Sequence, residues 1–280
     1  MATTTLELVN PRLSEGRFAS ITALTDEDLF AQTGVRIAFT QRSGGVSVGA
    51  YDSLNLGSHV KDDASLVQEN RRIVRAAFDA QDAWCVIPNQ VHGSTVLTVS
   101  DPAEVTCVQH EADEGADGIL ITTAQVAALL CFADCMPVIV VSPTGHFAVV
   151  HAGWRGVEGE IAAQAVRSLA AFDEAVLGRR AAEHFNVYIG PYIHAECFET
   201  SSEVHDRFTM KFGNDCAFDF CHIDLGYAQR VSLIAAGIDP LRLVDAGECT
   251  VCANDGYFSY RAQGGICGRH GAFAICSGEV

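Results

Sequence analysis

Apolar runs separated by short breaks of Pro and Gly dominate the middle of the chain, a pattern typical of buried strands. Three consecutive runs predict strands over Val126–Phe132, Val138–Ser142 and Phe147–His151. A glycine-punctuated loop then leads into an apolar-periodic segment, which predicts a helix over Gly159–Phe172. Cys135 and His151 both lie where an apolar strand meets a loop. The strands therefore form a rigid scaffold that presents two polar, metal-capable side chains to a ligand.

The same signals extend over the rest of the chain. Further strands are predicted over Val35–Thr40, Trp84–Ile87, Val96–Val99, Ile119–Thr122, Phe185–Ile189, Leu241–Val244 and Gly271–Cys276, and helices over Asp62–Phe78, Glu203–Phe212 and Leu225–Ala236. Residues 101–118 are acidic and predict a loop, and residues 213–224 are irregular. We expect residues 1–16 to be a frayed lead-in and residues 17–280 to form a single catalytic domain. Because strands and helices alternate only partly, the sequence predicts a mixed sheet core with helices outside it.

Composition narrows the class of protein. The 280 residues are 49% hydrophobic and 19% charged, as expected for a globular protein with a substantial core. A net charge of -17 argues against nucleic acid as a main partner, because a phosphate backbone requires a basic surface. We find no apolar run of about 18 residues and no apolar core near the N-terminus, so we expect neither a membrane span nor a signal peptide. Eleven scattered cysteines predict reduced thiols in a cytoplasmic protein, and a monomer is the default expectation.

His92, Cys135 and His151 form the candidate metal site. Each residue lies where a predicted strand meets a loop, and two imidazoles with one thiolate suit Zn²⁺. Three protein ligands with a fourth position open is the pattern of catalytic zinc, which makes bound water a nucleophile near neutral pH. Asp134 and Gln90 each lie beside a candidate ligand and can orient it or transfer a proton. Taken one at a time, Cys135 as a buried apolar residue and His151 as a core histidine are equally good interpretations.

Other constellations remain open at this level. Nucleophilic catalysis by Cys135, with His151 or His92 as base, suits an amide or ester substrate. His194-Ala195-Glu196 with Cys249-Thr250-Val251-Cys252 weakly resembles the H-x-E and P-C-x-x-C pattern of zinc deaminases, but Glu248 replaces the proline. As a structural zinc site, the two cysteines lack an obvious second pair, so they are interpreted as reduced loop or core thiols. A copper oxidase is disfavoured because the ten histidines include no His-x-His pair.

Several motifs carry a resemblance to a known family over most of the chain. They are Asn89-Gln90-Val91-His92-Gly93, Ala116-Asp117-Gly118, Ala133-Asp134-Cys135-Met136-Pro137 and His151-Ala152-Gly153-Trp154-Arg155-Gly156, supported by Ser53-Leu54-Asn55-Leu56-Gly57, Asn70-Arg71, Gly190-Pro191, Cys249-Thr250, Phe258-Ser259-Tyr260-Arg261 and Gly268-Arg269. The sequence resembles the polyphenol oxidase (laccase) domain family, understood as purine nucleoside phosphorylases with adenosine deaminase activity. Some bacterial members are described as peptidoglycan editing factors.

The resemblance implies an α+β fold, a central β-sandwich of mixed sheets flanked by helices. It implies that His92, Cys135 and His151 hold zinc at the catalytic centre, with copper, which the family's naming suggests, less favoured. Substrate-binding candidates are Arg71, Asn55, His59 and Arg155. The implied reactions are phosphorolysis of adenosine, inosine or S-methyl-5'-thioadenosine, with Arg71 holding phosphate, and deamination of adenosine. Asp134 is the proton-shuttle candidate because it neighbours Cys135.

One departure from the family pattern concerns the rim of the site. Family members often carry a Tyr-Glu pair after the Gly-Pro segment, where this chain has Cys197-Phe198-Glu199. Additional thiols near the centre also compete as metal ligands. Two alternatives to a nucleoside phosphorylase therefore stay open: an amidase that edits peptidoglycan precursors through Cys135 or zinc, and a zinc-binding protein without enzymatic activity.

Overall fold

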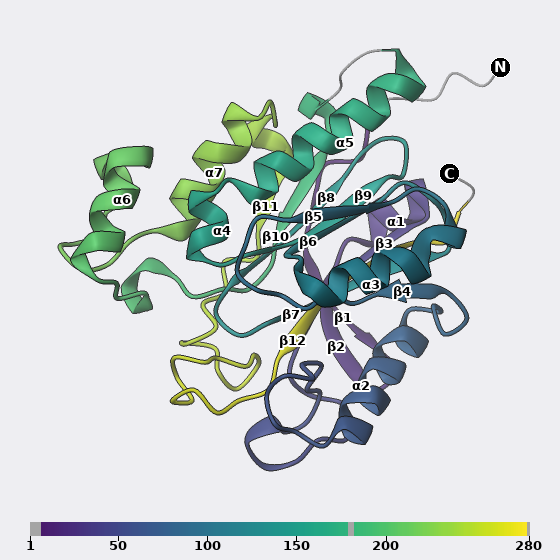
Figure 1. Cartoon of the computed structure of the whole chain (residues 1–280), viewed down its shortest axis with the longest axis horizontal. Helices are drawn as coiled ribbons and strands as arrows, with labels where there is room; N and C mark the ends of the chain where they lie inside the picture. Colours follow the sequence, from purple (N-terminus) through teal and green to yellow (C-terminus); the bar gives the residue numbers. More distant parts are fainter. Residues whose placement is uncertain (1–6, 179–181, 279–280) are drawn as a thin grey trace.

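Two mixed β-sheets packed face to face form the centre of the molecule (Figure 1). The computed structural model describes residues 7–178 and 182–278. The first sheet has the strand order β1 (Ser14–Phe18), β2 (Ile21–Thr25), β3 (Val35–Thr40), β12 (His270–Cys276), β7 (Val126–Phe132), β4 (Trp84–Val86). The second has the order β11 (Leu243–Asp245), β10 (Asn186–Ile189), β8 (Met136–Val141), β9 (Phe147–Ala152), β6 (Gly118–Ile121), β5 (Val96–Val99). The expected α+β fold, a sandwich of mixed sheets in a single domain, is confirmed.

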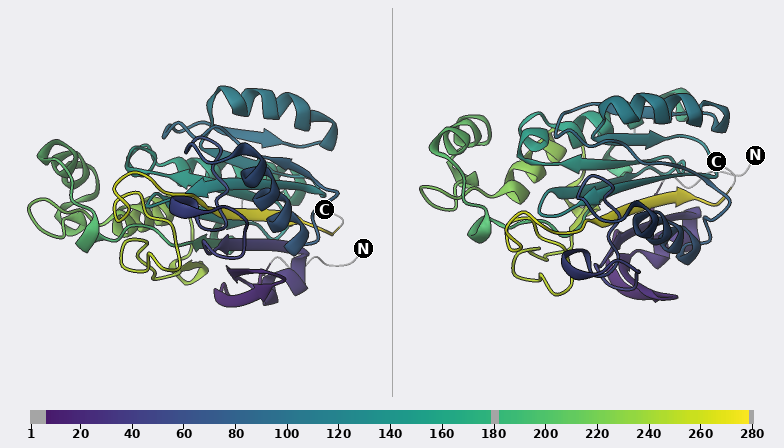
Figure 2. Two further views of the ribbon diagram at one scale, coloured as in Figure 1. Left: turned by 90° about the horizontal axis from the view of Figure 1, so that it is seen from below. Right: turned by 60° about the horizontal axis from the view of Figure 1, so that its bottom comes forward.

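Helices cover the outer faces of both sheets (Figure 2). The helices in the described ranges are α1 (Glu27–Thr33), α2 (Ala64–Ala77), α3 (Val105–Gly115), α4 (Trp154–Glu158), α5 (Ile161–Leu177), α6 (Ser202–Phe212) and α7 (Leu225–Ala235). Buried residues of α1 and α3 join the core between the sheets. Helix α2 packs on the first sheet, and α5 and α7 pack on the second. In both views of Figure 2, α6 and the loop of residues 249–269 lie toward the same end of the sandwich. None of the helices in the described ranges has the length and apolar character of a membrane span.

The central strands are apolar throughout because both of their faces are buried. All seven residues of β7 and all six of β8 and β9 are buried. Alternate side chains point to opposite faces, so Leu130 and Phe132 pack between the sheets while Leu129 packs against α2. Burial of one such side chain contributes roughly 1.5–3 kcal/mol of transfer free energy. This double burial explains why continuous apolar runs, without alternation, correctly predict these strands.

Residues 101–118 are not a loop, so this prediction is wrong. Asp101 and Glu104 form a capping box, and α3 follows from Val105. Val105, Val108 and Ala112 are buried at helical spacing against the strands, and the acidic residues point outward. The high content of acidic residues reflects an exposed helix face rather than an irregular segment.

The N-terminal region also differs from the expectation of a frayed lead-in. Leu8 is buried in the core between the sheets, and β1 already begins at Ser14. Residues 1–6 lie outside the described residues. The predicted helix over Gly159–Phe172 is observed as α5, shifted to Ile161–Leu177 and preceded by the short α4.

Candidate metal centre and active site

The turn between the two sheets brings the predicted ligands together. Cys135 lies in the turn where the chain passes from β7 of one sheet to β8 of the other. Strand β9 pairs antiparallel with β8, with His151 opposite Pro137, so His151 lies beside this turn. His92, from the loop after β4, reaches the same place: one ligand atom from each of the three residues lies within 4.8 Å of the other two. We call His92, Cys135 and His151 the cavity centre.

Asp117, which is fully buried, orients two members of the cavity centre. Its Oδ1 accepts a hydrogen bond from the backbone N–H of His92 (2.9 Å) and lies 2.7 Å from His151 Nδ1. Its Oδ2 accepts the backbone N–H of Gly93 (2.6 Å). A carboxylate on one ring nitrogen of a histidine fixes the ring and leaves the other nitrogen free as a ligand. Asp117 was not predicted to have a role, although it lies in the Ala-Asp-Gly motif where β6 begins.

Gly153 leaves the space that the cavity centre occupies. A Cβ atom at this position would lie 3.0 Å from His92 Cδ2 and 3.2 Å from Cys135 Sγ. Both distances are closer than ordinary van der Waals contact, so any larger residue would push a candidate ligand away. The His-Ala-Gly-Trp motif therefore combines a ligand with the small residue that the ligand requires.

The electrostatics of the cavity centre favour a thiolate. Burial raises the pKa of the Cys135 thiol, but the charge of His151 and hydrogen bonds from His151 and His92 outweigh it and lower the pKa to about 6. Burial lowers the pKa of His151, but Cys135 and Asp117 outweigh it and raise the pKa to about 9. Each partner stabilises the charged form of the other.

The donor set of the cavity centre fits a metal ion. A thiolate and two imidazoles suit zinc and copper, and a carboxylate behind one histidine is a usual second partner of a metal site. Three protein ligands on one wall of a cavity leave a position for a substrate, as in catalytic rather than structural sites.

A cavity of about 390 Å³ opens over the cavity centre. It is lined by His59, Gln90, His92, Cys131, Ala133, Asp134, Cys135, His151, Ile193, Phe198, Tyr260, Arg261 and Arg269. Phe198 and Tyr260 supply aromatic surface, and the two arginines supply positive charge. An apolar pocket with a few convergent polar groups is the usual form of a small-molecule site. A larger cavity of about 570 Å³ over α2 and β4 contains no member of the cavity centre.

The sequence profile of the family described as "Multi-copper polyphenol oxidoreductase laccase" matches residues 36–277. The chain belongs to this family. It is 32% identical over 252 residues to the purine nucleoside phosphorylase YlmD of Geobacillus stearothermophilus, covering 86% of this chain and 89% of that protein. It is 31% identical over 246 residues to the adenosine deaminase RL5 of an unknown prokaryotic organism, covering 84% of this chain and 92% of that protein.

A solved structure of a relative has the same fold. The crystal structure of YlmD from Geobacillus stearothermophilus superposes with a TM-score of 0.81 at 27% identity, covering 96% of this chain and all of that chain. This laccase-family chain thus shares the fold of a relative that it also resembles in sequence.

Asp134 and His59 line the cavity, as their assignment to the site requires. The Asp134 carboxylate accepts hydrogen bonds from Thr250 Oγ1 (2.7 Å), Ser259 Oγ (2.6 Å) and the backbone N–H of Arg261 (2.7 Å). It therefore anchors the loop of residues 249–269 beside the cavity centre. Proton transfer by Asp134 stays a prediction.

Arg71 lies in an adjoining cavity. Its Nε donates to the carbonyl of Leu56 (2.9 Å), and it lines a cavity of about 380 Å³ that also contains His59 and Gln90. Since His59 and Gln90 line both cavities, a ligand that fills the first can extend toward Arg71. The Gln90 side chain itself pairs in both directions with the backbone of Cys131, at 2.8 Å each.

Asn55 and Arg155 are not brought into this cavity. The Asn55 amide is fully buried and makes hydrogen bonds to Asp62 (2.9 Å) and to the backbone N–H of Arg269 (2.8 Å), so it supports the wall from behind. Arg155 is exposed on α4, with its guanidinium 4.2 Å from the ring centroid of Trp154.

Two arginines that line the cavity were missed as site residues. Arg269 lies just before β12, and Arg261 donates to the carbonyls of Cys197 (2.9 Å) and Glu199 (3.1 Å). Both lie in segments that carry the family resemblance, which was the available signal. Their approach to His59 depends on long-range packing that no local pattern reports.

Proposed function

We propose that the protein is a zinc-dependent purine nucleoside phosphorylase acting on adenosine, inosine and S-methyl-5'-thioadenosine, with adenosine deaminase activity. The observation that carries this proposal is the cavity centre on the wall of a cavity that combines aromatic surface with arginines. Two relatives, the purine nucleoside phosphorylase YlmD and the adenosine deaminase RL5, support the two activities.

In this proposal His92, Cys135 and His151 hold the zinc ion, and Asp117 keeps His151 in position. Bound zinc supplies Lewis acidity toward a substrate oxygen or water in contact with it. The thiolate form of Cys135 is already favoured before a metal arrives, because His151 and His92 outweigh the effect of burial on its pKa.

Phosphorolysis requires an anion site beside a purine site. An oxygen of orthophosphate attacks the anomeric carbon, the bond to the purine nitrogen breaks, and the electron pair leaves with the base, which takes up a proton. Burial lowers the pKa of His59, and the charges of Arg269 and Arg71 lower it further. The positive potential around His59 therefore suits phosphate, whose charge and geometry match guanidinium groups. Phe198 and Tyr260 offer the aromatic surface for the base.

Deamination uses the same cavity. Water replaces the amino group at C6 of adenine, and ammonia leaves with the proton it requires. Asp134 is the proposed proton carrier, because it precedes Cys135 in the chain and lines the cavity.

We also propose a cytoplasmic monomer. All eleven cysteines are free thiols, which suits a reducing compartment.

The deciding experiment measures metal content and adenosine turnover, with and without phosphate, on one purified sample. The proposal expects zinc in the cavity centre and phosphate-dependent release of adenine and ribose 1-phosphate. Cys135→Ala and His151→Ala are expected to lose both activities while circular dichroism stays native. Cys107→Ala, which removes an exposed thiol on α3, is the matched control. Full phosphorolysis in either cavity-centre variant without zinc would sink the proposal.

One observation favours a second candidate, the cysteine amidase that edits peptidoglycan precursors. Asp117, His151 and Cys135 follow the order of a catalytic triad, with the carboxylate on one side of the imidazole and a low-pKa thiol on the other. If the protein is the amidase, cleavage of muropeptide amides should survive chelation and stop on alkylation of Cys135. If it is the phosphorylase, chelation should remove its activity.

A further inference from the structure

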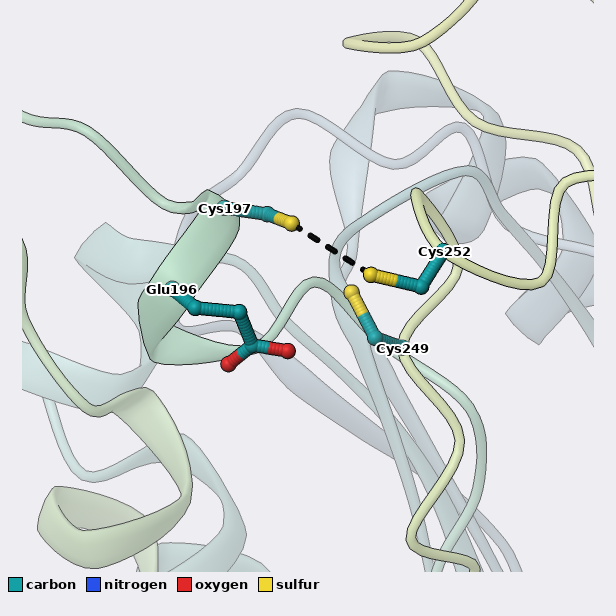
Figure 3. Close-up of side chains that lie close together, drawn as sticks. All are labelled: Glu196, Cys197, Cys249 and Cys252. Atoms are coloured by element: carbon teal, nitrogen blue, oxygen red, sulfur yellow. Dashed lines mark hydrogen bonds between the residues drawn. The ribbon is translucent and has the colours of Figure 1, made fainter.

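Three cysteines and one glutamate gather outside the active-site cavity. Glu196 and Cys197 lie on a short 3-10 helix, η4 (Ala195–Cys197), while Cys249 and Cys252 lie in the loop after β11. One ligand atom from each of the four residues lies within 4.8 Å of the other three. Figure 3 shows the sulfur atoms gathered together with the Glu196 carboxylate near them. We propose that these four residues, which we call the cysteine cluster, form a second metal site that binds zinc in a structural role.

The spacing of the sulfur atoms matches a metal site better than a disulfide. Cys197 Sγ and Cys252 Sγ are 3.6 Å apart, the contact dashed in Figure 3. Tetrahedral zinc with bonds of about 2.3 Å to sulfur separates two sulfur ligands by about 3.8 Å. A disulfide brings its sulfur atoms to about 2.05 Å. The two thiols therefore stand near the separation that a shared zinc ion sets.

Backbone pairing holds the two halves of the cysteine cluster together. Tyr192, just before η4, forms a parallel bridge with Cys249, and its carbonyl accepts the N–H of Thr250 at 3.0 Å. The backbone N–H of Ala253 donates to the carbonyl of Cys249 at 2.8 Å, closing a turn over the two cysteines. The ligands thus come from segments that are distant in sequence but fixed by main-chain hydrogen bonds.

The ligand set is closed and has the right chemistry. Cys249 and Cys252 have the C-x₂-C spacing of structural zinc sites, and Cys197 and Glu196 complete four ligands. The sequence had shown no second pair for Cys249 and Cys252; the structure supplies these partners. The backbone N–H of His194 donates to Cys249 Sγ at 3.4 Å, which holds the sulfur of this buried residue in place. Cys252 and Glu196 are exposed, so an ion can enter from solvent.

A metal in the cysteine cluster would fix the rim of the cavity. Phe198 follows Cys197 directly and lines the cavity. Arg261, from the loop that carries Cys252, lines the same cavity and donates to the carbonyl of Cys197 at 2.9 Å. Zinc would therefore tie together the two segments that supply these side chains.

The test counts zinc in the purified full-length protein by mass spectrometry. With both sites filled, wild type is expected to hold about two zinc ions per chain and Cys197→Ser/Cys252→Ser about one. Cys107→Ser is the matched control and keeps the wild-type content. Replacement of zinc by cobalt reports thiolate ligation directly, and the double variant is expected to lose most of the sulfur-to-cobalt charge-transfer absorption.

Two results would overturn the second site: unchanged zinc content and cobalt spectrum in the double variant, or a Cys197–Cys252 disulfide in the freshly purified protein. If the double variant does not fold, Glu196→Gln provides the test, with faster loss of one zinc to a chelator expected and wild-type loss contradicting the proposal. Cys135→Ala removes only the cavity-centre zinc, so failure of this inference is distinguishable from failure of the proposed activity.

Discussion

The cavity centre and the cysteine cluster place cysteine thiols in opposite electrostatic surroundings. In the cavity centre, His151 and His92 outweigh the effect of burial and lower the pKa of Cys135 to about 6. In the cysteine cluster, burial and the neighbouring thiols of Cys252 and Cys249 raise the pKa of Cys197 to about 12. The protein itself supplies positive charge that stabilises the thiolate of Cys135, whereas the surroundings of Cys197 favour its neutral thiol.

The two ligand sets also differ in completeness. The cavity centre offers three ligands and faces a cavity, whereas the cysteine cluster offers four and does not line that cavity. An open set suits chemistry and a closed set suits structural support. We therefore expect the loss of a ligand from the cavity centre to abolish turnover, and the loss of a ligand from the cysteine cluster to weaken the fold.

The largest expected effect comes from removing one cysteine from each of the two sites in turn. Cys135→Ala is expected to reduce adenosine turnover by more than about 100-fold, a larger loss than that typical of residues behind a metal ligand. Cys197→Ala is expected to retain most turnover but to lower the melting temperature by about 5 °C or more, because bound metal stabilises the native state. Steady-state kinetics and thermal unfolding on the same samples check both. Equal loss of turnover in both variants would contradict the different roles assigned to the two sites.

Asp117→Asn is expected to have the next largest effect. Both carboxylate oxygens of Asp117 face N–H donors, from His92 and His151 on one side and Gly93 on the other. An amide nitrogen in either position therefore opposes a donor, which disturbs the ring of His151. Removing such a partner typically costs about 10- to 100-fold in metal affinity or activity. Zinc titration and kinetics measure the loss, and Asp206→Asn, an exposed change on α6, is the control.

Much of the sandwich is predictable because its central strands are buried on both faces. Strands β7, β8 and β9 are continuous apolar runs, which are recognisable in a single sequence. Helix α3 was hidden because only Val105, Val108 and Ala112 are buried, and most of its other residues are polar and exposed. Strands β1 and β2 are short and partly exposed, so their pattern resembles that of a loop.

The candidate site was also predicted only in part from the sequence. His92, Cys135 and His151 stand out because each lies where a predicted strand meets a loop. Asp117 gives no such signal, since a buried carboxylate is recognisable only once its hydrogen-bond partners are known. The pairing of Cys197 with Cys252 depends on a bridge between segments 55 residues apart, which sequence spacing does not reveal.

A smaller effect is expected from two buried histidines, whose pKa values are shifted in opposite directions. Asp117 and Cys135 raise the pKa of the buried His151 to about 9. Burial, followed by the charges of Arg269 and Arg42, lowers the pKa of His270 to about 3. His270 lies in β12 against the rings of Phe132 and Tyr257, and the backbone of Pro191, which raises its pKa, does not outweigh burial and the two arginines.

The neutral His270 predicts a loss of stability in acid. Above pH about 6.5 the imidazole is neutral in both states, and below it the unfolded chain binds a proton that the native protein does not bind until pH approaches about 3. The free energy of unfolding should therefore fall by about 1.4 kcal/mol per pH unit on this account. His270→Phe, which keeps a ring in the apolar site, should reduce the slope by this amount between pH 6 and 5. Urea unfolding at both pH values measures it, with the exposed His110→Gln as control. Parallel slopes for wild type and His270→Phe would mean that His270 takes up a proton inside the sandwich, so that charge compensation would no longer distinguish it from His151.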